Sequence, residues 1–264
     1  MIHAAGPPAR GTDTPARIDR RRGGSAANVA AAAARAGGAV RFIGRVGADA
    51  LGDVLVGALV ADGVDVRVQR AGRTGAVAVL VEPGGERTML PDRGAAAELE
   101  AIDPAWLTDV GWLHLTAYSL CGEPAGSASI DAAGRVRGAG GRVSVDVSSV
   151  TVVEAFGRSR FTDLLDRLEP DVVFANAVEA GALAAPPRGL LVVKDGPRPV
   201  VITHPDGRTI EVDVPALGAV ADTTGAGDAF AAGFVVAMLA GSSVELAARS
   251  GVASAARALD RAGE

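Results

Sequence analysis

Apolar, β-branched stretches alternate with helical stretches from residue 106 onward, and this alternation limits the fold of the 264-residue chain more than any other feature. Repetition of strand, helix and strand is typical of a parallel sheet that is flanked by helices. The sequence therefore predicts an α/β domain. We predict strands at 112–117, 143–147, 172–175 and 190–193, and helices at 125–137, 160–168 and 178–184.

Further elements are predicted on both sides of this core. An Asp206-Gly207 pair between two β-rich stretches indicates a hairpin turn, and Gly63 ends a helical stretch near the N-terminus. We predict a hairpin from 200–203 and 209–214, helices at 26–36, 52–61, 227–240 and 243–259, and a strand at 40–43.

Residues 64–92 differ from the rest of the chain. Valines alternate with polar residues from 64 to 68, an apolar run covers 76–81, and a return strand at 87–90 follows a Pro-Gly-Gly turn. Strands without a helix between them are typical of a small antiparallel sheet. The sequence therefore predicts a separate small sheet in this segment.

Composition argues against several classes of protein. Cys121 is the only cysteine, so the chain has no disulfide framework and no cysteine-rich zinc site. No stretch approaches the ~20 apolar residues of a membrane span, and the first residues lack the apolar core of a signal peptide. The formal charge of −5 argues against nucleic-acid binding. We expect a soluble, cytoplasmic protein with no nucleic-acid or membrane partner.

The segment 222–230 reads DTTGAGDAF and leads into an apolar helical stretch. The first N–H groups of a helix have no partner within the helix and carry partial positive charge, and glycines let a phosphate approach the backbone. This start of a helix predicts an anion site. Asp228 is then either an ordinary helix N-cap or a catalytic base that faces a phosphoryl group.

A second motif, GGSAANVA at 23–30, precedes further glycine-containing segments between 37 and 52. An alanine-rich helix that is capped by Ser25 explains most of this motif. It does not explain the polar Asn28 within the helix. Asn28 is therefore a candidate for a binding role.

Taken together and in this order, the two motifs closely resemble the signatures of the ribokinase-like (PfkB) carbohydrate kinases, and the resemblance covers nearly the whole chain. It implies one ribokinase-like domain over 1–264, with a mainly parallel sheet flanked by helices and a small β-sheet lid from about 12–22 and 64–92. It also implies an ATP-dependent, magnesium-requiring kinase that transfers the γ-phosphate to a hydroxyl of a small sugar or sugar acid.

The resemblance implies catalytic roles for the second signature. Asp228 would be the general base that takes the proton from the sugar hydroxyl. The backbone N–H groups of Gly225, Ala226 and Gly227, with that of Asp228, would form the anion hole for the transferring phosphate.

The resemblance also implies a sugar site in the first signature. Gly23 and Gly24 would let the sugar lie against the backbone, and Asn28 would bind sugar hydroxyls. Arg93, next to the predicted lid, is a further candidate contact. A solvated hairpin charge is the alternative for Arg93.

The nucleotide site is implied by three short segments. Asn176 and Glu179 match the family's N-x-x-E motif, in which Asn176 would lie near the phosphates and Glu179 would hold magnesium through water. A capping box that only stabilises a helix is the alternative. Lys194 and Gly196 would line the nucleotide, as would Thr223, and a solvated strand end is the alternative for Lys194.

Several assignments stay open. Asp222 and Thr224 lie where many relatives bind a monovalent cation, so potassium is a candidate cofactor, and local turn capping is the alternative. Asp146 begins an Asp-x-Ser segment that loosely matches the family's Asp-x-Asn motif, and a structural role is the alternative. His114 receives no ligand role.

Two other functions also stay open. A nucleoside kinase of the same fold would need an aromatic lid wall, and residues 64–90 contain no aromatic residue. A catalytically impaired, sugar-sensing homologue is the second alternative. We also expect a homodimer through the lid, because a small sheet with one apolar face needs cover.

Residues 1–22 contain no apolar run, and we predict a loop with an extended piece near 16–20. In the family, an apolar strand in the middle of the main sheet comes before this point. A central parallel strand should be almost continuously apolar. We therefore expect the first central strand to be missing and two strands to lack a shared partner.

Overall fold

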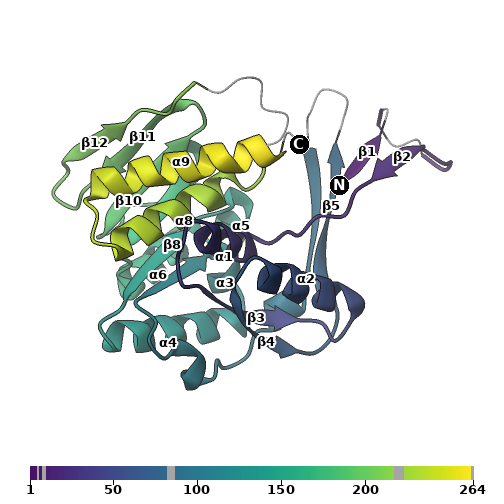
Figure 1. Ribbon diagram of the computed structural model, residues 1–264, viewed down its shortest axis with the longest axis horizontal. Helices are drawn as coiled ribbons and strands as arrows, with labels where there is room; N and C mark the ends of the chain where they lie inside the picture. The colour runs from purple at the N-terminus through teal and green to yellow at the C-terminus, as the bar shows by residue number, and fades with distance from the viewer. Residues whose placement is uncertain (5, 8–9, 82–86, 217–222, 263–264) are drawn as a thin grey trace.

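The computed structural model describes residues 1–4, 6–7, 10–81, 87–216 and 223–262, and these residues form three sheets (Figure 1). The largest sheet has the order β12-β11-β10-β9-β8-β7, with bounds Thr209–Val212, Arg198–Thr203, Leu190–Asp195, Val172–Asn176, Arg142–Asp146 and Trp112–Thr116. Strands β7 to β10 are parallel to one another, and β11 and β12 continue the sheet in antiparallel pairing. The predicted α/β fold with a mainly parallel sheet is confirmed.

Helices α8 (Ala226–Leu239) and α9 (Val244–Ala262) cover one face of the six-stranded sheet (Figure 1). Phe174 of β9 packs edge-on against Phe230 and Phe234 of α8, with ring centroids 6.3 Å and 5.3 Å apart. Edge-to-face aromatic pairs stabilise a core beyond the area that they bury. This packing fixes the position of α8 over the parallel strands.

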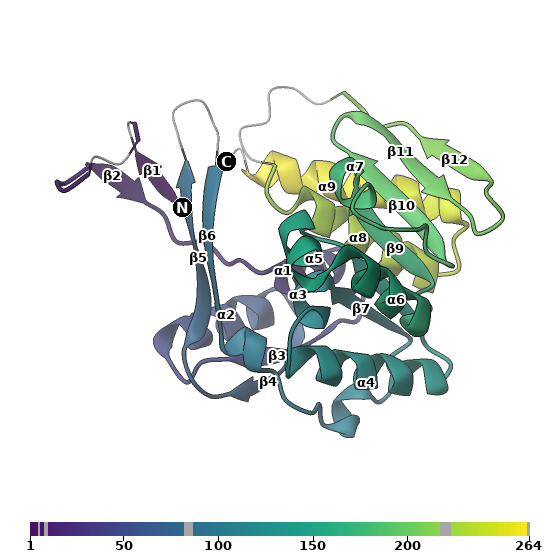
Figure 2. The same cartoon turned by 180° about the vertical axis from the view of Figure 1, so that it is seen from behind.

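The opposite face is covered by α3 (Ala117–Leu120), α4 (Ala125–Gly138), α5 (Val150–Phe156) and α6 (Arg158–Leu168), as Figure 2 shows. Val145, Val173 and Phe161 are fully buried in this second layer. A parallel strand that is buried on both faces needs apolar side chains on both faces. The apolar runs of the sequence therefore become the middle of the sheet.

A short parallel pair of strands forms the second sheet, from β3 (Arg41–Val46) and β4 (Asp65–Arg70). Helix α2 (Ala50–Ala61) connects them, as a parallel pair requires. Val64 and Leu59 are buried against α1 (Ser25–Arg35). The prediction that 64–92 is one lid segment is therefore wrong for residues 64–70, because β4 pairs with β3 and Val64 and Val66 pack against α1 and α2.

The third sheet, called the small sheet below, has the order β2-β1-β5-β6 and stands apart from the six-stranded sheet (Figure 1). Its strands are β2 (Ala16–Ile18), β1 (Ile2–Ala4), β5 (Thr74–Val81) and β6 (Arg87–Gly94). β6 is an edge strand, and an edge position accommodates Pro91. The predicted return strand therefore extends past residue 90 and includes Arg93.

The N-terminal segment does not enter the main sheet. Ile2 pairs with Ile18 in antiparallel register and with Leu80 in parallel register. Within the described residues, none of 1–22 joins the six-stranded sheet, and β3 and β7 belong to different sheets. Helix α1 packs against both β3 and β7. The expected absence of a strand in residues 1–22 that joins the main sheet matches this arrangement, whereas β1 in the small sheet was not predicted.

Element boundaries agree with the predictions to within a few residues elsewhere. The hairpin of β11 and β12 turns through Gly207, which has a φ of +83°. The clearest differences are α5, which was not predicted, and α7 (Ala177–Ala180), which is a single turn where a longer helix at 178–184 is predicted. A turn of this length stays helical mainly through its capping interactions.

Candidate active site

The N-terminus of α8 lies at the carboxyl end of the parallel strands. Gly225 is its N-cap residue, with a left-handed φ of +81°, a conformation that favours glycine. The N–H of Ala226 donates to the carbonyl of Thr223 at 3.3 Å, which closes the turn before the helix. Thr223 and Thr224 are exposed in this turn. Asp222 lies outside the described residues.

Asp228, in the first turn of α8, is held from helix α1. Ser25 Oγ donates to Asp228 Oδ1 at 2.7 Å, and Asn28 Nδ2 donates to Oδ2 at 2.9 Å. Val29 of α1 packs on Ala232 of α8, which keeps the two helices together. The structure thus brings Asp228 together with Asn28, as the predicted site requires.

Ser25 does not cap α1. The N-cap position belongs to Gly24, which has a φ of +94°, and no side chain makes a capping hydrogen bond there. The expectation that Ser25 caps this helix is wrong, because its hydroxyl points to Asp228 instead. Gly23 is exposed in the segment just before the helix.

Burial raises the pKa of Asp228 above its ordinary value, although the hydrogen bonds from Ser25 and Asn28 act in the opposite direction. The negative charge of Asp146 adds to the increase, and the positive charge of Lys194 reduces it. A carboxylate with a raised pKa is a better proton acceptor than an exposed one.

A buried ion pair lies beneath the start of α8. Lys194 Nζ is 2.8 Å from Asp146 Oδ2, and the two side chains are only 15% and 7% exposed. Ser148 donates its backbone N–H and its hydroxyl to Asp146 Oδ1 at 2.8 Å and 3.0 Å. Burial raises the pKa of Asp146, but the charge and hydrogen bond of Lys194, together with His114 and the hydrogen bond from Ser148, hold that pKa below the ordinary value.

Lys194 also contacts helix α8 directly. Its Nζ donates to the carbonyl of Gly227 at 3.5 Å. A Cβ atom at position 227 would lie 3.3 Å from the same Nζ, so glycine lets the lysine approach the helix. Lys194, which the sequence places at the end of a strand, is therefore largely buried and paired with Asp146, and it is not a solvated charge.

Asn176 and Glu179 form a reciprocal capping box at α7. Asn176 Oδ1 accepts from the N–H of Glu179 at 2.8 Å, and Glu179 Oε2 accepts from the N–H of Asn176 at 2.8 Å. Glu179 is only 8% exposed, and burial raises its pKa. The capping interpretation is confirmed as a contact, and it leaves the second carboxylate oxygen of Glu179 outside the box.

Arg22 is a site residue that sequence reasoning missed. Its Nη1 donates to the carbonyl of Ala27 at 2.6 Å and lies 3.4 Å from Asn28 Oδ1, and its Nη2 is 3.8 Å from Asp62. Arg22 ends a run of three arginines that looks like a solvated charged segment. Only the fold distinguishes it from its two neighbours.

Among the described contacts, Arg93 has none with Asp228. Its Nη2 donates to the carbonyl of Tyr118 at 2.5 Å, which links the small sheet to α3. Among the described contacts, Arg93 therefore joins two parts of the backbone and is not a solvated hairpin charge.

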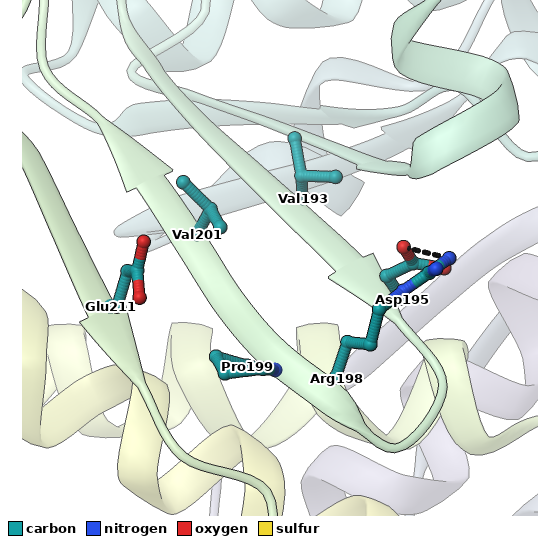
Figure 3. A pocket seen from close by; sticks show the side chains of 6 residues that line it. All are labelled: Val193, Asp195, Arg198, Pro199, Val201 and Glu211. Carbon is teal, nitrogen blue, oxygen red and sulfur yellow. Dashed lines mark ion pairs between the residues drawn. The ribbon is translucent and has the colours of Figure 1, made fainter.

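Gly196 turns the chain between β10 and β11 with a φ of +58°. Next to this turn, on the sheet face opposite α8, lies a pocket of about 210 Å³ (Figure 3). Asp195 and Arg198 form an ion pair at its rim. The pocket is lined by Val193, Asp195, Arg198, Pro199, Val201 and Glu211.

Neither a membrane-spanning helix nor a cluster of metal-ligating side chains is found among the described residues. No helix among them is both long and apolar enough to cross a membrane. In the same residues, no group of three or more His, Cys, Asp or Glu side chains is arranged to hold a metal ion.

Comparison with known proteins places the chain in a family. The model described as pfkB family carbohydrate kinase matches residues 1–264. A fructokinase of Salmonella typhimurium is 31% identical over 244 residues, which cover 83% of this chain and 77% of the relative. An ATP-dependent ribose-1-phosphate kinase of Halopiger xanaduensis is 34% identical over 241 residues, which cover 85% of this chain and 76% of the relative.

A solved structure shows the same fold. The crystal structure of adenosine kinase from Sinorhizobium meliloti superposes with a TM-score of 0.83 at 28% identity, and the match covers 92% of this chain and 78% of that chain. The family match over the full length and the geometry around Asp228 lead to one assignment. The chain belongs to the pfkB family of carbohydrate kinases, which have the ribokinase-like fold and are phosphotransferases with an alcohol group as acceptor.

Proposed function

We propose that this chain is an ATP- and magnesium-dependent kinase that phosphorylates a hydroxyl of a small sugar or sugar acid in the cytoplasm. One observation carries the proposal. Asp228, a half-buried carboxylate with a raised pKa, lies in the first turn of α8 and within hydrogen-bond distance of Asn28. A base and an anion-binding helix start are thereby combined in one turn.

The reaction follows from this arrangement. The acceptor hydroxyl loses its proton to Asp228 as its oxygen bonds to the γ-phosphorus, and the bond from phosphorus to the ADP oxygen breaks. The N–H groups of Gly225, Ala226, Gly227 and Asp228 stabilise the charge on the transferring phosphate. General-base catalysis contributes about 10²- to 10⁴-fold, and each anion-hole donor roughly 3 kcal/mol.

The sugar would lie against Gly23 and Gly24 and receive hydrogen bonds from Asn28. Gly24 has a φ of +94°, and nothing fills the space around Gly23, so the backbone is accessible there. Arg93 would contribute from the side of the small sheet. The fructokinase and ribose-1-phosphate kinase relatives make fructose and ribose 1-phosphate the first substrates to test.

The nucleotide would approach from the side of Asn176, Lys194, Gly196 and Thr223. The enclosed charge of Lys194 lies behind Gly227, where it favours phosphate binding at the helix start. Asp222 and Thr224 are the proposed monovalent-cation ligands, with potassium as the ion.

Magnesium would be held by Glu179 through water. The donor set fits this role, because magnesium keeps several waters and takes one or two carboxylates together with substrate phosphates. Glu179 is buried, and one of its oxygens is outside the capping box. When bound, the ion neutralises charge on the β- and γ-phosphates. Glu179→Gln is expected to raise the magnesium concentration that gives half-maximal activity.

The small sheet is proposed as a lid that excludes water from the transfer step. Ile18, Val77, Met89 and Leu90 are 70%, 47%, 53% and 57% exposed on it. Apolar groups of this size on a free sheet favour pairing with a second copy. We therefore propose a homodimer through the lid, which light scattering over a range of protein concentrations tests.

A substrate panel tests the function as a whole. Purified protein is incubated with ATP and magnesium together with single sugars, sugar phosphates, sugar acids or nucleosides, and ADP formation and phosphorylated product are measured. Product with a sugar and none with the Asp228→Asn variant is the expected result. Product with adenosine would identify a nucleoside kinase, which the adenosine kinase neighbour makes the second candidate. No product with any compound would favour a sugar-sensing protein.

A further inference from the structure

The hydroxyl of Ser25 occupies the place where an acceptor hydroxyl has to be. Ser25 Oγ lies 2.7 Å from Asp228 Oδ1, with the hydroxyl donating and the carboxylate accepting. A general base and the hydroxyl that it deprotonates lie ~2.6–3.2 Å apart. The serine therefore reproduces the contact that a sugar hydroxyl would make with the base.

Helix capping does not account for this contact. Gly24 is the N-cap of α1, and no side chain makes a capping bond there. Elsewhere in the chain a serine at a helix start has the ordinary role: Ser149 Oγ accepts from the N–H of Val152 at 3.3 Å, and Ser243 Oγ accepts from the N–H of Leu246 at 3.3 Å. Ser25 differs from both because its hydroxyl is directed to a residue 203 positions away.

The other carboxylate oxygen of Asp228, Oδ2, already has a hydrogen-bond donor. Asn28 Nδ2 donates to Oδ2 at 2.9 Å, and Arg22 Nη1 lies 3.4 Å from Asn28 Oδ1. Because the guanidinium only donates, it fixes which end of the amide faces the carboxylate. Oδ1 is therefore the oxygen for which Ser25, a sugar hydroxyl and water compete.

We propose that Ser25 is a placeholder for the acceptor hydroxyl: it occupies Asp228 Oδ1 until a sugar binds, and so keeps water from being activated there. The inference rests on the proposed kinase function. Ser25 is half-buried, and rotation about one side-chain bond releases the base. The sugar hydroxyl then restores the hydrogen bond that the serine gives up, so the exchange costs little.

Loss of the placeholder has a defined chemical consequence. A water molecule at Oδ1 gives its proton to Asp228 as its oxygen bonds to the γ-phosphorus, and the bond from phosphorus to the ADP oxygen breaks. The products are ADP and inorganic phosphate, with no sugar consumed. Ser25→Ala should therefore increase sugar-independent ATP hydrolysis relative to sugar phosphorylation.

The experiment uses the full chain with ATP and magnesium, and measures phosphate release without sugar and product formation with the best sugar of the panel. We expect the ratio of hydrolysis to sugar phosphorylation to rise roughly tenfold in Ser25→Ala, which corresponds to ~1.4 kcal/mol. Ser25→Thr keeps a hydroxyl and should restore the parent ratio. Ser243→Ala, which removes a serine that only serves the start of α9, is the matched control and should leave the ratio unchanged.

A merely structural role would not give this pattern. The increase in sugar-independent ATP hydrolysis must disappear in the Ser25→Ala/Asp228→Asn double variant, because that hydrolysis depends on the base. Ser25→Gly is a second hydroxyl-free variant in case the alanine variant does not fold. An unchanged ratio in a folded hydroxyl-free variant that still phosphorylates sugar overturns the placeholder and leaves the kinase function intact. A parent protein that phosphorylates nothing on the panel overturns both.

Discussion

The starts of helices α7 and α8 both carry an acid in the first turn, buried in α7 and half-buried in α8, but they hold that acid in different ways. Glu179 is bonded to the backbone of Asn176, three residues away in the same turn. Asp228 is bonded to Ser25 and Asn28, about 200 residues away on α1. In both acids, burial raises the pKa. The position of Glu179 is therefore set within its own helix, whereas the position of Asp228 depends on how α8 packs against α1.

The two helix starts also differ in their neighbours. Lys194 contacts the first turn of α8, because its Nζ donates to the carbonyl of Gly227, and it is also paired with Asp146. The capping box of α7 is complete without a contact of this kind. We infer that α8 carries the reactive acid and α7 a supporting one. The following predictions test this difference.

The largest effect is expected from Asp228→Asn, which removes the base and keeps the N–H groups of the helix start. Turnover should fall by about 10²- to 10⁴-fold with nucleotide binding largely intact. Steady-state kinetics and calorimetric titration with ATP measure the two quantities. Asp131→Asn, which removes an exposed acid paired with Arg135, is the control. Near-normal turnover in Asp228→Asn would reject the assignment of the base.

Lys194→Met should destabilise the fold, because it leaves the carboxylate of Asp146 buried without its partner. Removing one member of a buried pair costs ~3–5 kcal/mol. Urea denaturation gives the free energy of unfolding. The Asp146→Asn/Lys194→Met double variant should recover part of the loss, and Arg135→Met, in an exposed pair, should cost no more than about 0.5 kcal/mol. Equal losses of unfolding free energy in Lys194→Met and Arg135→Met would show that the pair of Lys194 and Asp146 contributes no more than an exposed ion pair.

Asn28→Ala should raise the sugar KM about tenfold, since one hydrogen bond to a buried hydroxyl corresponds to ~1.4 kcal/mol. It also removes the bond to Asp228 Oδ2, so a smaller fall in kcat is expected. Initial rates over a range of sugar and ATP concentrations separate the two substrates. A change in the ATP KM alone would contradict a sugar-binding role.

Asn176→Ala should lower the stability by ~1 kcal/mol, because it removes a helix cap. Glu179→Gln is the matched variant: its amide oxygen can still accept from the N–H of Asn176, so stability should change little. Thermal unfolding compares them. If Glu179→Gln destabilises as much as Asn176→Ala, the charge of Glu179, and not its hydrogen bond, supports the turn.

The smallest effect is a displacement of the pH profile. Asp228 must be ionised to accept a proton, and its pKa is raised. As the pH is lowered, kcat should therefore begin to fall at a higher pH than it would with an aspartate of ordinary pKa. Asp146 raises that pKa and Lys194 lowers it. Asp146→Asn should therefore move the acidic limb to lower pH and Lys194→Met should move it to higher pH. Shifts in the same direction would show that the pair does not act on Asp228 through its charges.

Much of the fold and part of the site were predictable because their causes are local in sequence. Hydrophobic runs and turn residues located strands β7 to β10 and the β11–β12 hairpin. The spacing of Asn176 and Glu179 was enough to raise a capping box as one interpretation, since both bonds lie within one turn. The sequence was less informative for β1 and β4. A three-residue strand leaves no periodic pattern, and alternating valines show that one face is buried but not against which partner.

The amino-acid sequence by itself determined that Asp228 begins an apolar helix after a glycine turn, and that an Asn28 lies in a second helix. The tertiary structure alone decided that Ser25 contacts the base, that Arg22 among three arginines orients Asn28, and that Lys194 is paired with Asp146. The reason is physical. Helix starts, caps and periodicity depend on neighbours within a few residues, whereas contacts between distant polar groups depend on which elements pack together, and buried polar groups need such partners.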